Sequence, residues 1–170
     1  MQTTDDQKEL FVVVDENDAI LGYRSRNECH HDKTLIHRTA GVLVFDGDRF
    51  LLQKRSLTKD TSPGKWGISS AGHVMKDETY EQTAIRELEE EIGLRGQILT
   101  FKKTFLERTS IESEMMTLFI CQSKGPFMVN KTEVSEVRFF TISELIKEMK
   151  NGSVVLSDGA LVTLKQINIL

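Results

Sequence analysis

A cluster of acidic residues marks one predicted helix of this chain. Glu87, Glu89, Glu90 and Glu91 crowd into five positions of the stretch SSAGHVMKDETYEQTAIRELEEEIGL, which covers residues 69–94. Two unit charges about 5–6 Å apart repel by roughly 3 kcal/mol at an effective dielectric constant of about 20. The helix therefore needs either a solvated acidic face that salt screens or a cation among its carboxylates. Mg²⁺ has the oxygen-ligand preference for such a place where phosphates are also bound.

The ends of this helix are marked by its own residues. Thr79 and Gln82 have the spacing of an N-terminal capping box, and Gly93 stands where a helix ends. The helix therefore spans roughly residues 80–92. Three aliphatic residues at helical spacing are expected to pack on a sheet: Ile85, Leu88 and Ile92.

Strands dominate the rest of the sequence. The expected elements are a hairpin in residues 10–26, a second hairpin in residues 41–56 with Asp46-Gly47 at its tip, strands in residues 117–123 and 136–142, a helix opened by Thr141 and Glu144, and a last helix in residues 156–169. Strands interleaved with a few helices predict an α/β or α+β sandwich.

Composition narrows the class of protein. A chain of 170 residues with a net charge of −4 suits one domain and argues against binding to a nucleic acid polymer or an anionic membrane. Apolar runs stay short of the roughly 20 residues that span a bilayer. Cys29 and Cys121 are the only cysteines, and their spacing matches no motif. With a polar N-terminus, they favour a cytoplasmic protein.

The spacing around the acidic cluster carries a family resemblance. Residues 72–94 match every fixed position of the Nudix box, G-x5-E-x7-R-E-U-x-E-E-x-G-U, where U is aliphatic. The chain therefore resembles Nudix hydrolases over roughly residues 37–147. The resemblance implies an α/β/α sandwich around a mixed sheet. Residues 1–36 would then form an N-terminal hairpin extension of one domain, and residues 156–169 a C-terminal helix.

The resemblance also implies roles within the box. Three carboxylates would bind Mg²⁺ or Mn²⁺ against a diphosphate: Glu87, Glu90 and Glu91. Glu78 would assist through the metal shell, Arg86 would orient the carboxylates, and Gly72 would allow a tight turn. A cation in this place neutralises developing negative charge and lowers the pKa of a bound water, whose attack on phosphorus splits the diphosphate.

Other residues complete the predicted hydrolytic site. The base should be a carboxylate, and Glu136 or Glu133 in the segment NKTEVSEVRFF is expected to supply it. Lys54 and Arg55 end a strand where cations can meet phosphate, although a solvated strand end is the alternative. His73 follows Gly72 and joins the predicted substrate-binding set.

A second resemblance concerns residues 37–74, which are similar to type 1 isopentenyl diphosphate isomerases. These isomerases have a second divalent-metal centre of three histidines and two glutamates. The matching residues here are His30, His37, His73, Glu112 and Glu114. Imidazole and carboxylate ligands suit Zn²⁺, Mn²⁺ or Mg²⁺. The alternatives are a polar loop for His30, a packed side chain for His37 and a solvated strand face for the two acids.

The isomerase chemistry fits the sequence less well. Ala71 stands where those enzymes have a catalytic cysteine, and the segment FKKTFLE lacks their tyrosine. Their C-terminal tryptophan is also missing, since the only tryptophan is Trp66, for which core packing is expected rather than stacking on a base. Cys29 lies outside any matching motif and is expected to be a structural thiol.

These observations predict an isomerase-like Nudix hydrolase. Its substrate would be a small molecule with a diphosphate linkage, such as a nucleoside diphosphate, a nucleotide conjugate or a prenyl diphosphate. The alternatives are a true isomerase and a non-catalytic domain that senses nucleotides or binds a partner. The oligomeric state is left open, with a homodimer among the alternatives.

Overall fold

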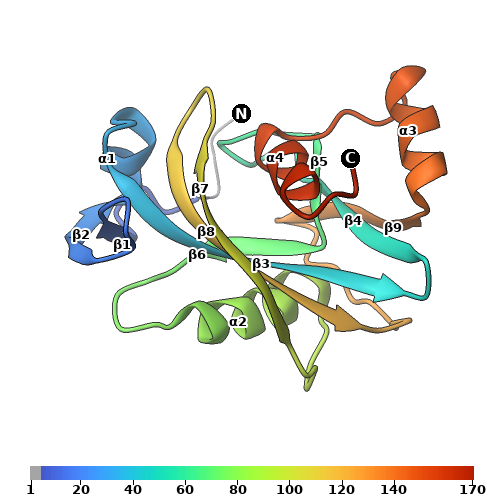
Figure 1. Ribbon diagram of the computed structural model, residues 1–170, viewed down its shortest axis with the longest axis horizontal. Helices are drawn as coiled ribbons and strands as arrows, with labels where there is room; N and C mark the ends of the chain where they lie inside the picture. Colours follow the sequence, from blue (N-terminus) through green and yellow to red (C-terminus); the bar gives the residue numbers. More distant parts are fainter. Residues whose placement is uncertain (1–4) are drawn as a thin grey trace.

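The computed structural model of the protein describes residues 5–170, and their strands form one mixed sheet of nine strands. The elements are β1 (Leu10–Val14), β2 (Ile20–Ser25), α1 (Arg26–His31), β3 (Ile36–Asp46), β4 (Arg49–Arg55), β5 (Trp66–Ile68), β6 (Ser70–His73), α2 (Tyr80–Ile92), β7 (Thr100–Arg108), β8 (Ser113–Gln122), β9 (Val134–Phe140), α3 (Ile142–Lys150) and α4 (Asp158–Gln166). Figure 1 shows the strands crossing the middle of the molecule, with helices above and below.

Strand β3 organises the sheet. It runs parallel to β8 along ten residue pairs and antiparallel to β1, β4 and β6. Strand β2 continues the sheet beyond β1, β5 and β9 pair with β4, and β7 pairs with β8. Most of β3 is buried, and residues 40–45 form a continuous apolar run, as expected of a strand segment covered on both faces.

Side-chain alternation along β3 builds two cores. Val42 and Val44 join the cluster that packs against α2, whereas Leu43 joins the cluster that contains residues of α3 and α4. Successive side chains of a strand point to opposite faces, so one apolar strand serves both cores. Helix α2 therefore covers one face and α3 and α4 the other, which confirms the predicted α/β/α arrangement (Figure 1).

Helix α2 has the predicted ends but a shifted apolar face. Thr79 and Gln82 form the capping box, and Gly93 closes the helix at φ 69°. Leu88 and Ile92 are buried, but the prediction for Ile85 was wrong, because its side chain is 47% exposed. Residue 84 lies four positions before Leu88 and stacks directly above it on the helix. The small Ala84 occupies that buried position, which leaves residue 85 at the solvent edge.

The N-terminal region contains a helix that the sequence pattern did not indicate. Ser25 and Glu28 form a capping box that opens α1, so His30 and His31 lie on a helix rather than in a polar loop. The predicted hairpin before it is present as β1 and β2, and β1 adds to the edge of β3. The first four residues of the predicted extension lie outside the described residues.

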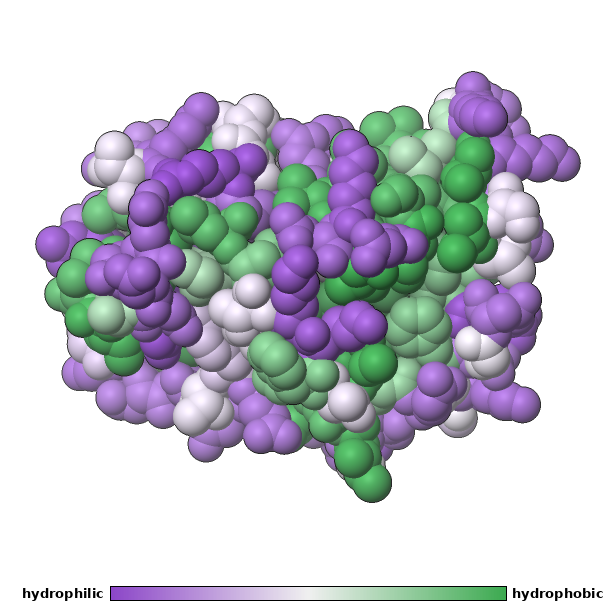
Figure 2. All heavy atoms as spheres, viewed as in Figure 1, coloured by the Kyte–Doolittle hydropathy of each residue, from purple (hydrophilic) through white to green (hydrophobic). Residues whose placement is uncertain are grey.

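The second hairpin differs in one detail from the expected turn. Asp46 pairs with Arg49, so Gly47 and Asp48 form the tip, with Gly47 at φ 63°. Figure 2 shows hydrophilic side chains over most of the visible face and apolar ones gathered between α4 and α3. Within residues 5–170, no helix is long and apolar enough to cross a membrane.

Candidate active site

One cavity of about 440 Å³ collects side chains from distant parts of the chain. The expected site residues that line it are Arg55, Gly72, His73, Arg86, Glu87, Glu90, Glu91, Glu112 and Glu114. The alternative acid Glu133 lines it as well. Three further expected residues lie behind this wall, in contact with it: Glu78, His30 and His37. The site is therefore assembled from β4, β6, β8, α2 and the segments around them.

The side chain of Glu87 leaves room only for glycine at position 72. A Cβ atom added at Gly72 would lie 1.9 Å from Oε1 of Glu87 and 2.2 Å from its Cδ. Any larger residue would push the carboxyl group away, because real Cβ contacts below 3.0 Å are essentially never seen. Glycine at this position therefore lets a carboxylate of α2 lie flat against strand β6.

Arg86 connects three of the box carboxylates. Its Nε and Nη2 donate hydrogen bonds to Glu78 at 2.8 and 3.0 Å, and its Nη1 donates to Glu87 and, at 3.1 Å, to Glu90. Nη2 also reaches the carbonyl oxygen of His73 at 3.3 Å. The planar guanidinium thus fixes the carboxylates of α2 relative to the loop that carries His73, as a flexible ammonium group does not.

Glu91 is buried and held by neutral donors. Its Oε2 accepts hydrogen bonds from Nε2 of Gln53 at 2.9 Å and from the backbone N–H of Ala71 at 3.0 Å. Burial, reinforced by the nearby Glu87, raises the pKa of Glu91 to about 8. Burial also raises the pKa of Glu87 to about 7, although Arg86 opposes the shift. Two carboxyl groups are therefore short of positive charge at this wall.

Residues of the box fit a divalent cation on chemical grounds. Glu87, Glu90 and Glu91 face one cavity, and Arg86 supplies the only cationic group hydrogen-bonded to any of them among the described residues. Burying ionised carboxylates is costly unless they are paired or coordinate a metal. A hard cation that accepts oxygen ligands is the complement of this donor set.

A second group of ligand atoms lies beside the box. One atom from each of four residues falls within 4.8 Å of the others: His30, His37, His73 and Glu112. Nε2 of His30 lies 3.0 Å from Oε2 of Glu112, and Nε2 of His37 lies 3.7 Å from both Glu112 and Glu114. All five residues predicted for a second metal centre are thus adjacent, since Glu114 also lies 3.9 Å from His73.

His37 has no hydrogen-bond partner among the described residues. Both of its ring nitrogens are buried without a hydrogen bond, whereas Nε2 of His30 and Oε2 of Glu112 lie 3.0 Å apart and face each other. Burial lowers the pKa of His37 to about 4, and burial followed by the neighbouring His37 lowers that of His73 well below its usual value. Neutral imidazoles with unshared lone pairs are metal ligands, so the donor set fits a divalent metal.

The N-terminal segment closes the cavity with a charged network. Arg26 is buried and donates to both oxygens of Asp60, at 2.8 and 2.9 Å, while its Nη1 lies 3.4 Å from Nδ1 of His73. Lys59 pairs with Asp5 and with Glu133. Glu133 was a candidate from the sequence, but no motif pointed to Arg26, Lys59 or Asp60, because their partners lie more than 30 positions away along the chain.

Two expected site residues point elsewhere. Lys54 and Glu136 are cross-strand neighbours of β4 and β9, and neither is among the described residues that line the cavity. Gln53 and Arg55 do line it. Since side chains alternate along a strand, Lys54 faces the opposite side. Arg55 donates to the carbonyl and hydroxyl oxygens of Thr61 at 2.9 and 3.0 Å.

The remaining candidate residues are buried side chains that pack in the interior. Cys29 is fully buried, and burial raises the pKa of its thiol to about 12, so it is a structural thiol as predicted. Trp66 is 4% exposed and packs edge-on against Phe140 at 5.4 Å, which confirms core packing. Phe11 stacks on the ring of His73 at 3.9 Å and holds it in place.

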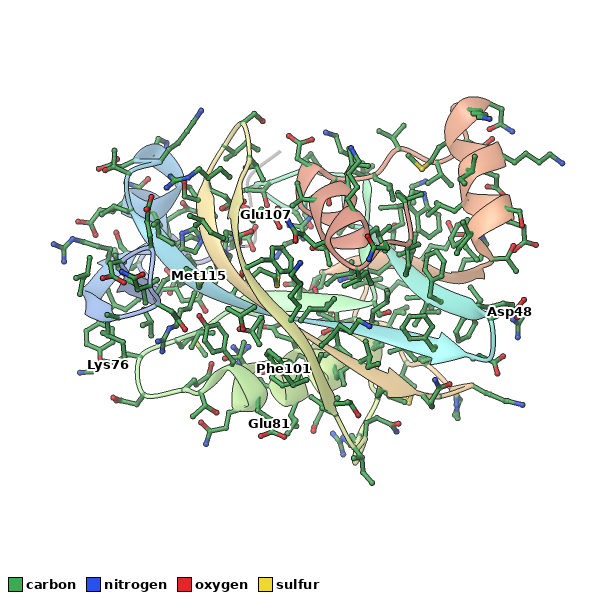
Figure 3. The ribbon with its side chains drawn as sticks, viewed as in Figure 1. Asp48, Lys76, Glu81, Phe101, Glu107 and Met115 are labelled. Atoms are coloured by element: carbon green, nitrogen blue, oxygen red, sulfur yellow. The ribbon has the colours of Figure 1, made fainter. Side chains whose placement is uncertain are left out.

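Glu107 was missed by the sequence analysis. It lies on β7 (Figure 3), lines the same cavity and is 1% exposed. Burial, followed by repulsion from Glu114, raises its pKa to about 9. The sequence feature that could have indicated Glu107 is the alternation of side chains along its strand, because Phe105 and Glu107 lie two positions apart and share the buried side.

Comparisons with known proteins agree with this geometry. The family model described as NUDIX domain matches residues 35–158. An uncharacterized Nudix hydrolase of Pseudomonas aeruginosa is 32% identical over 144 residues, which cover 84% of this chain and 85% of the relative. An isopentenyl-diphosphate Delta-isomerase of Streptomyces avermitilis is 30% identical over 143 residues, covering 80% of this chain and 73% of the relative.

Solved structures share the fold at lower identity. The protein DR0079 of Deinococcus radiodurans superposes with a TM-score of 0.79 at 20% identity, covering 94% of this chain and 99% of its own. The NUDIX domain of NrtR from Shewanella oneidensis, solved with ADP ribose, gives 0.61 at 20% identity, covering 76% and 84%. With a complete box, a matching family model and relatives of this coverage, the chain belongs to the Nudix hydrolase family.

Proposed function

We propose that this chain is an Mg²⁺- or Mn²⁺-dependent hydrolase that cleaves the diphosphate linkage of a nucleotide or a related small molecule. The observation that carries the proposal is that Glu87, Glu90 and Glu91 line one cavity. Gly72 lies beside them, and its lack of a side chain leaves room for the carboxyl group of Glu87 against strand β6. A divalent cation held by these carboxylates would neutralise charge on the diphosphate and make an attacking water more acidic.

The chain's own residues supply the rest of the reaction. Arg86 keeps Glu87 and Glu90 at fixed positions, and Gln53 does so for Glu91 through its amide N–H. Arg55 lines the cavity and offers a cation to a phosphate oxygen. Positioning of this kind accounts for much of the catalysis of phosphoryl transfer.

The identity of the base is part of the proposal. Of the two acids in the segment after β8, Glu133 faces the cavity and Glu136 does not. Glu133 is held by Lys59, whose ammonium group also contacts Asp5. We therefore favour Glu133 over Glu136 as the residue that accepts the proton of the attacking water.

A second metal centre at the histidine cluster is also proposed. His30, His37, His73 and Glu112 offer ligand atoms within 4.8 Å of one another, the ring nitrogens of His37 have no hydrogen bond among the described residues, and Glu114 completes the set. This cluster also supports the isomerase as a second candidate function. Ala71 weighs against it, since an alanine methyl exchanges no proton, and Trp66 lies in the core rather than over a substrate.

The decisive experiment pairs a substrate screen with a matched mutation. Wild-type protein is incubated with Mg²⁺ or Mn²⁺ and a panel of nucleotide and prenyl diphosphates, and phosphate release and product mass are measured. The side chain of Glu90 is 56% exposed, so Glu90→Gln should fold normally yet lose on the order of 10²-fold or more in turnover.

Glu89→Gln is the control for this mutation. Glu89 lies next to Glu90 on α2, and its one ion pair within residues 5–170 is with the exposed Arg95, at 2.6 Å, an interaction of small energetic effect. Its turnover should stay within about twofold of wild type. Full turnover by a well-folded Glu90→Gln protein in saturating Mg²⁺ would show that the proposed function is wrong.

A further inference from the structure

Glu107 has a buried carboxyl group to which no described residue donates a hydrogen bond. Its side chain comes from β7, where it stands opposite Glu114 of β8, and it is 1% exposed. Neither of its oxygens has a hydrogen bond within residues 5–170. A buried polar group without a partner is costly. Such a group at the wall of a cavity therefore indicates a ligand that completes its hydrogen bonds.

The first turn of α4 faces this carboxyl group. A Cβ atom added at Gly159 would lie 2.9 Å from Oε1 of Glu107, so the backbone of α4 comes close to it (Figure 3). The N–H of Ser157 donates to Trp66, and that of Ala160 donates to the hydroxyl of Ser157. The first N–H group that bonds within the helix is that of Leu161, so the N–H groups of residues 158 and 159 come before it and have no acceptor among the described residues.

This end of the cavity adjoins the histidine cluster at Glu114 and is continuous with the box. The four close-lying ligand atoms of that cluster include none from Glu107. One cavity nevertheless joins the two ends, because Glu87 and Glu90 of the box line it together with Glu107 and Gly159. A molecule whose diphosphate lies at the box can therefore extend to α4.

Charge decides what kind of group fits there. Glu112, Glu114 and Asp158 all surround Glu107 with negative charge, which disfavours a second anion. A hydrocarbon would leave the carboxyl group and two N–H groups without partners, at a cost in free energy. A hydroxyl group satisfies both sides, because it donates to the carboxyl oxygen and accepts from the backbone N–H groups.

We propose that Glu107 and the first turn of α4 bind the hydroxyl groups of a sugar attached to the diphosphate. The proposal rests on the proposed function and narrows its substrate class to sugar-bearing diphosphates rather than prenyl diphosphates. It makes Glu107 a residue for specificity, whose removal should weaken binding of sugar-bearing substrates far more than it slows their conversion.

The test compares two probes. ADP-ribose carries a ribose on each side of its diphosphate and so presents hydroxyl groups in either orientation, whereas isopentenyl diphosphate carries none. Dissociation constants are measured with Mg²⁺ by calorimetry in the Glu90→Gln background, which slows turnover, and KM and kcat are measured in the wild-type background. The variants are Glu107→Leu and Gly159→Ala, with Lys102→Gln, an exposed residue of the same strand, as the control.

The expected pattern is specific. Both variants should bind ADP-ribose about tenfold more weakly, as for the loss of buried hydrogen bonds, with KM rising more than kcat falls. Isopentenyl diphosphate should bind both variants within about twofold of the parent protein. Glu107→Leu should also unfold at a higher temperature, because it removes an unpartnered buried carboxyl group, an effect opposite to the loss of a structural residue.

Two results would overturn the subsite. One is tight ADP-ribose binding by Glu107→Leu at the level of the parent protein. The other is a parent protein that binds ADP-ribose no more tightly than isopentenyl diphosphate, even if it hydrolyses the latter and so upholds the proposed function. Conversely, binding of ADP-ribose that depends on Glu107, without hydrolysis of any diphosphate, would reject the proposed function and leave the subsite intact.

Discussion

Replacing Gly72 by alanine should separate catalysis from stability. The new methyl group would lie 1.9 Å from Oε1 of Glu87, whereas an ordinary contact begins at 3.4 Å. The carboxyl group would therefore have to retreat by about 1.5 Å. Misplacement of a catalytic group by about 1 Å costs on the order of 10²-fold in rate, so kcat/KM should fall by at least that factor.

The loss of stability should be small by comparison. Gly72 lies within β6 outside the positive-φ region, so alanine fits its backbone. The clash falls on the far end of a flexible side chain that can swing toward the cavity. Overpacking of this kind costs about 1 kcal/mol at the lower end of its usual range, which lowers Tm by roughly 2–4 °C in a domain of this size.

The assay measures phosphate release with Mg²⁺ on the best substrate of the screen, together with thermal unfolding. Gly67→Ala is the matched control, because Gly67 lies on the neighbouring β5 and its methyl group would meet the nearest atom, Cγ of Gln53, at 3.7 Å. It should keep activity within about threefold. Wild-type kcat/KM for Gly72→Ala would refute the reasoning, since it would mean that the position of Glu87 against β6 has no part in turnover.

Two further predictions follow from the same site. Mg²⁺ at about 100 times its Kd should raise Tm by roughly 5–10 °C through preferential binding to the native state, and the rise should shrink in the Glu87→Gln/Glu90→Gln double mutant; an equal rise in both proteins would place the cation elsewhere. Neither wild type nor Ala71→Cys should convert isopentenyl diphosphate to its allylic isomer, followed by proton NMR with Mg²⁺ or Mn²⁺; turnover near 1 per second by the wild type would overturn the hydrolase assignment.

Local features of the fold were readable from the sequence because they depend on neighbours in the chain. The capping boxes at Thr79 and Thr141 and the stop at Gly93 are satisfied by residues three or four positions away. The exposure of Ile85 was not readable, since both it and Ala84 suit the edge of an apolar face. Only the packing of α2 against the sheet decides which of them is buried.

The candidate site also has one part that the sequence predicts locally and one part that depends on the whole fold. The box lies on one continuous stretch, and its match to the family motif predicted that Glu87, Glu90 and Glu91 would bind one metal together. The histidine cluster instead depends on strand pairing, because His37 stands opposite Glu114 of β8, and β6 brings His73 to the other edge of β3. Family resemblance predicted those residues, but no local pattern does, since register between distant strands is set by the whole sheet.

The contacts of Arg86 divide the box carboxylates into two roles. Glu78 accepts from two nitrogens of the guanidinium with its two oxygens, and Thr83 and the N–H of Met75 donate to it as well, so it is already satisfied. Glu87 and Glu90 share the single remaining nitrogen, Nη1, and keep acceptor capacity for a cation. We therefore expect Glu78 to act on the metal through Arg86, while Glu87 and Glu90 bind the metal directly. An Arg86→Lys protein should then not retain activity. One ammonium group lacks the planar set of donors with which Arg86 binds Glu78 on one side and Glu87 and Glu90 on the other.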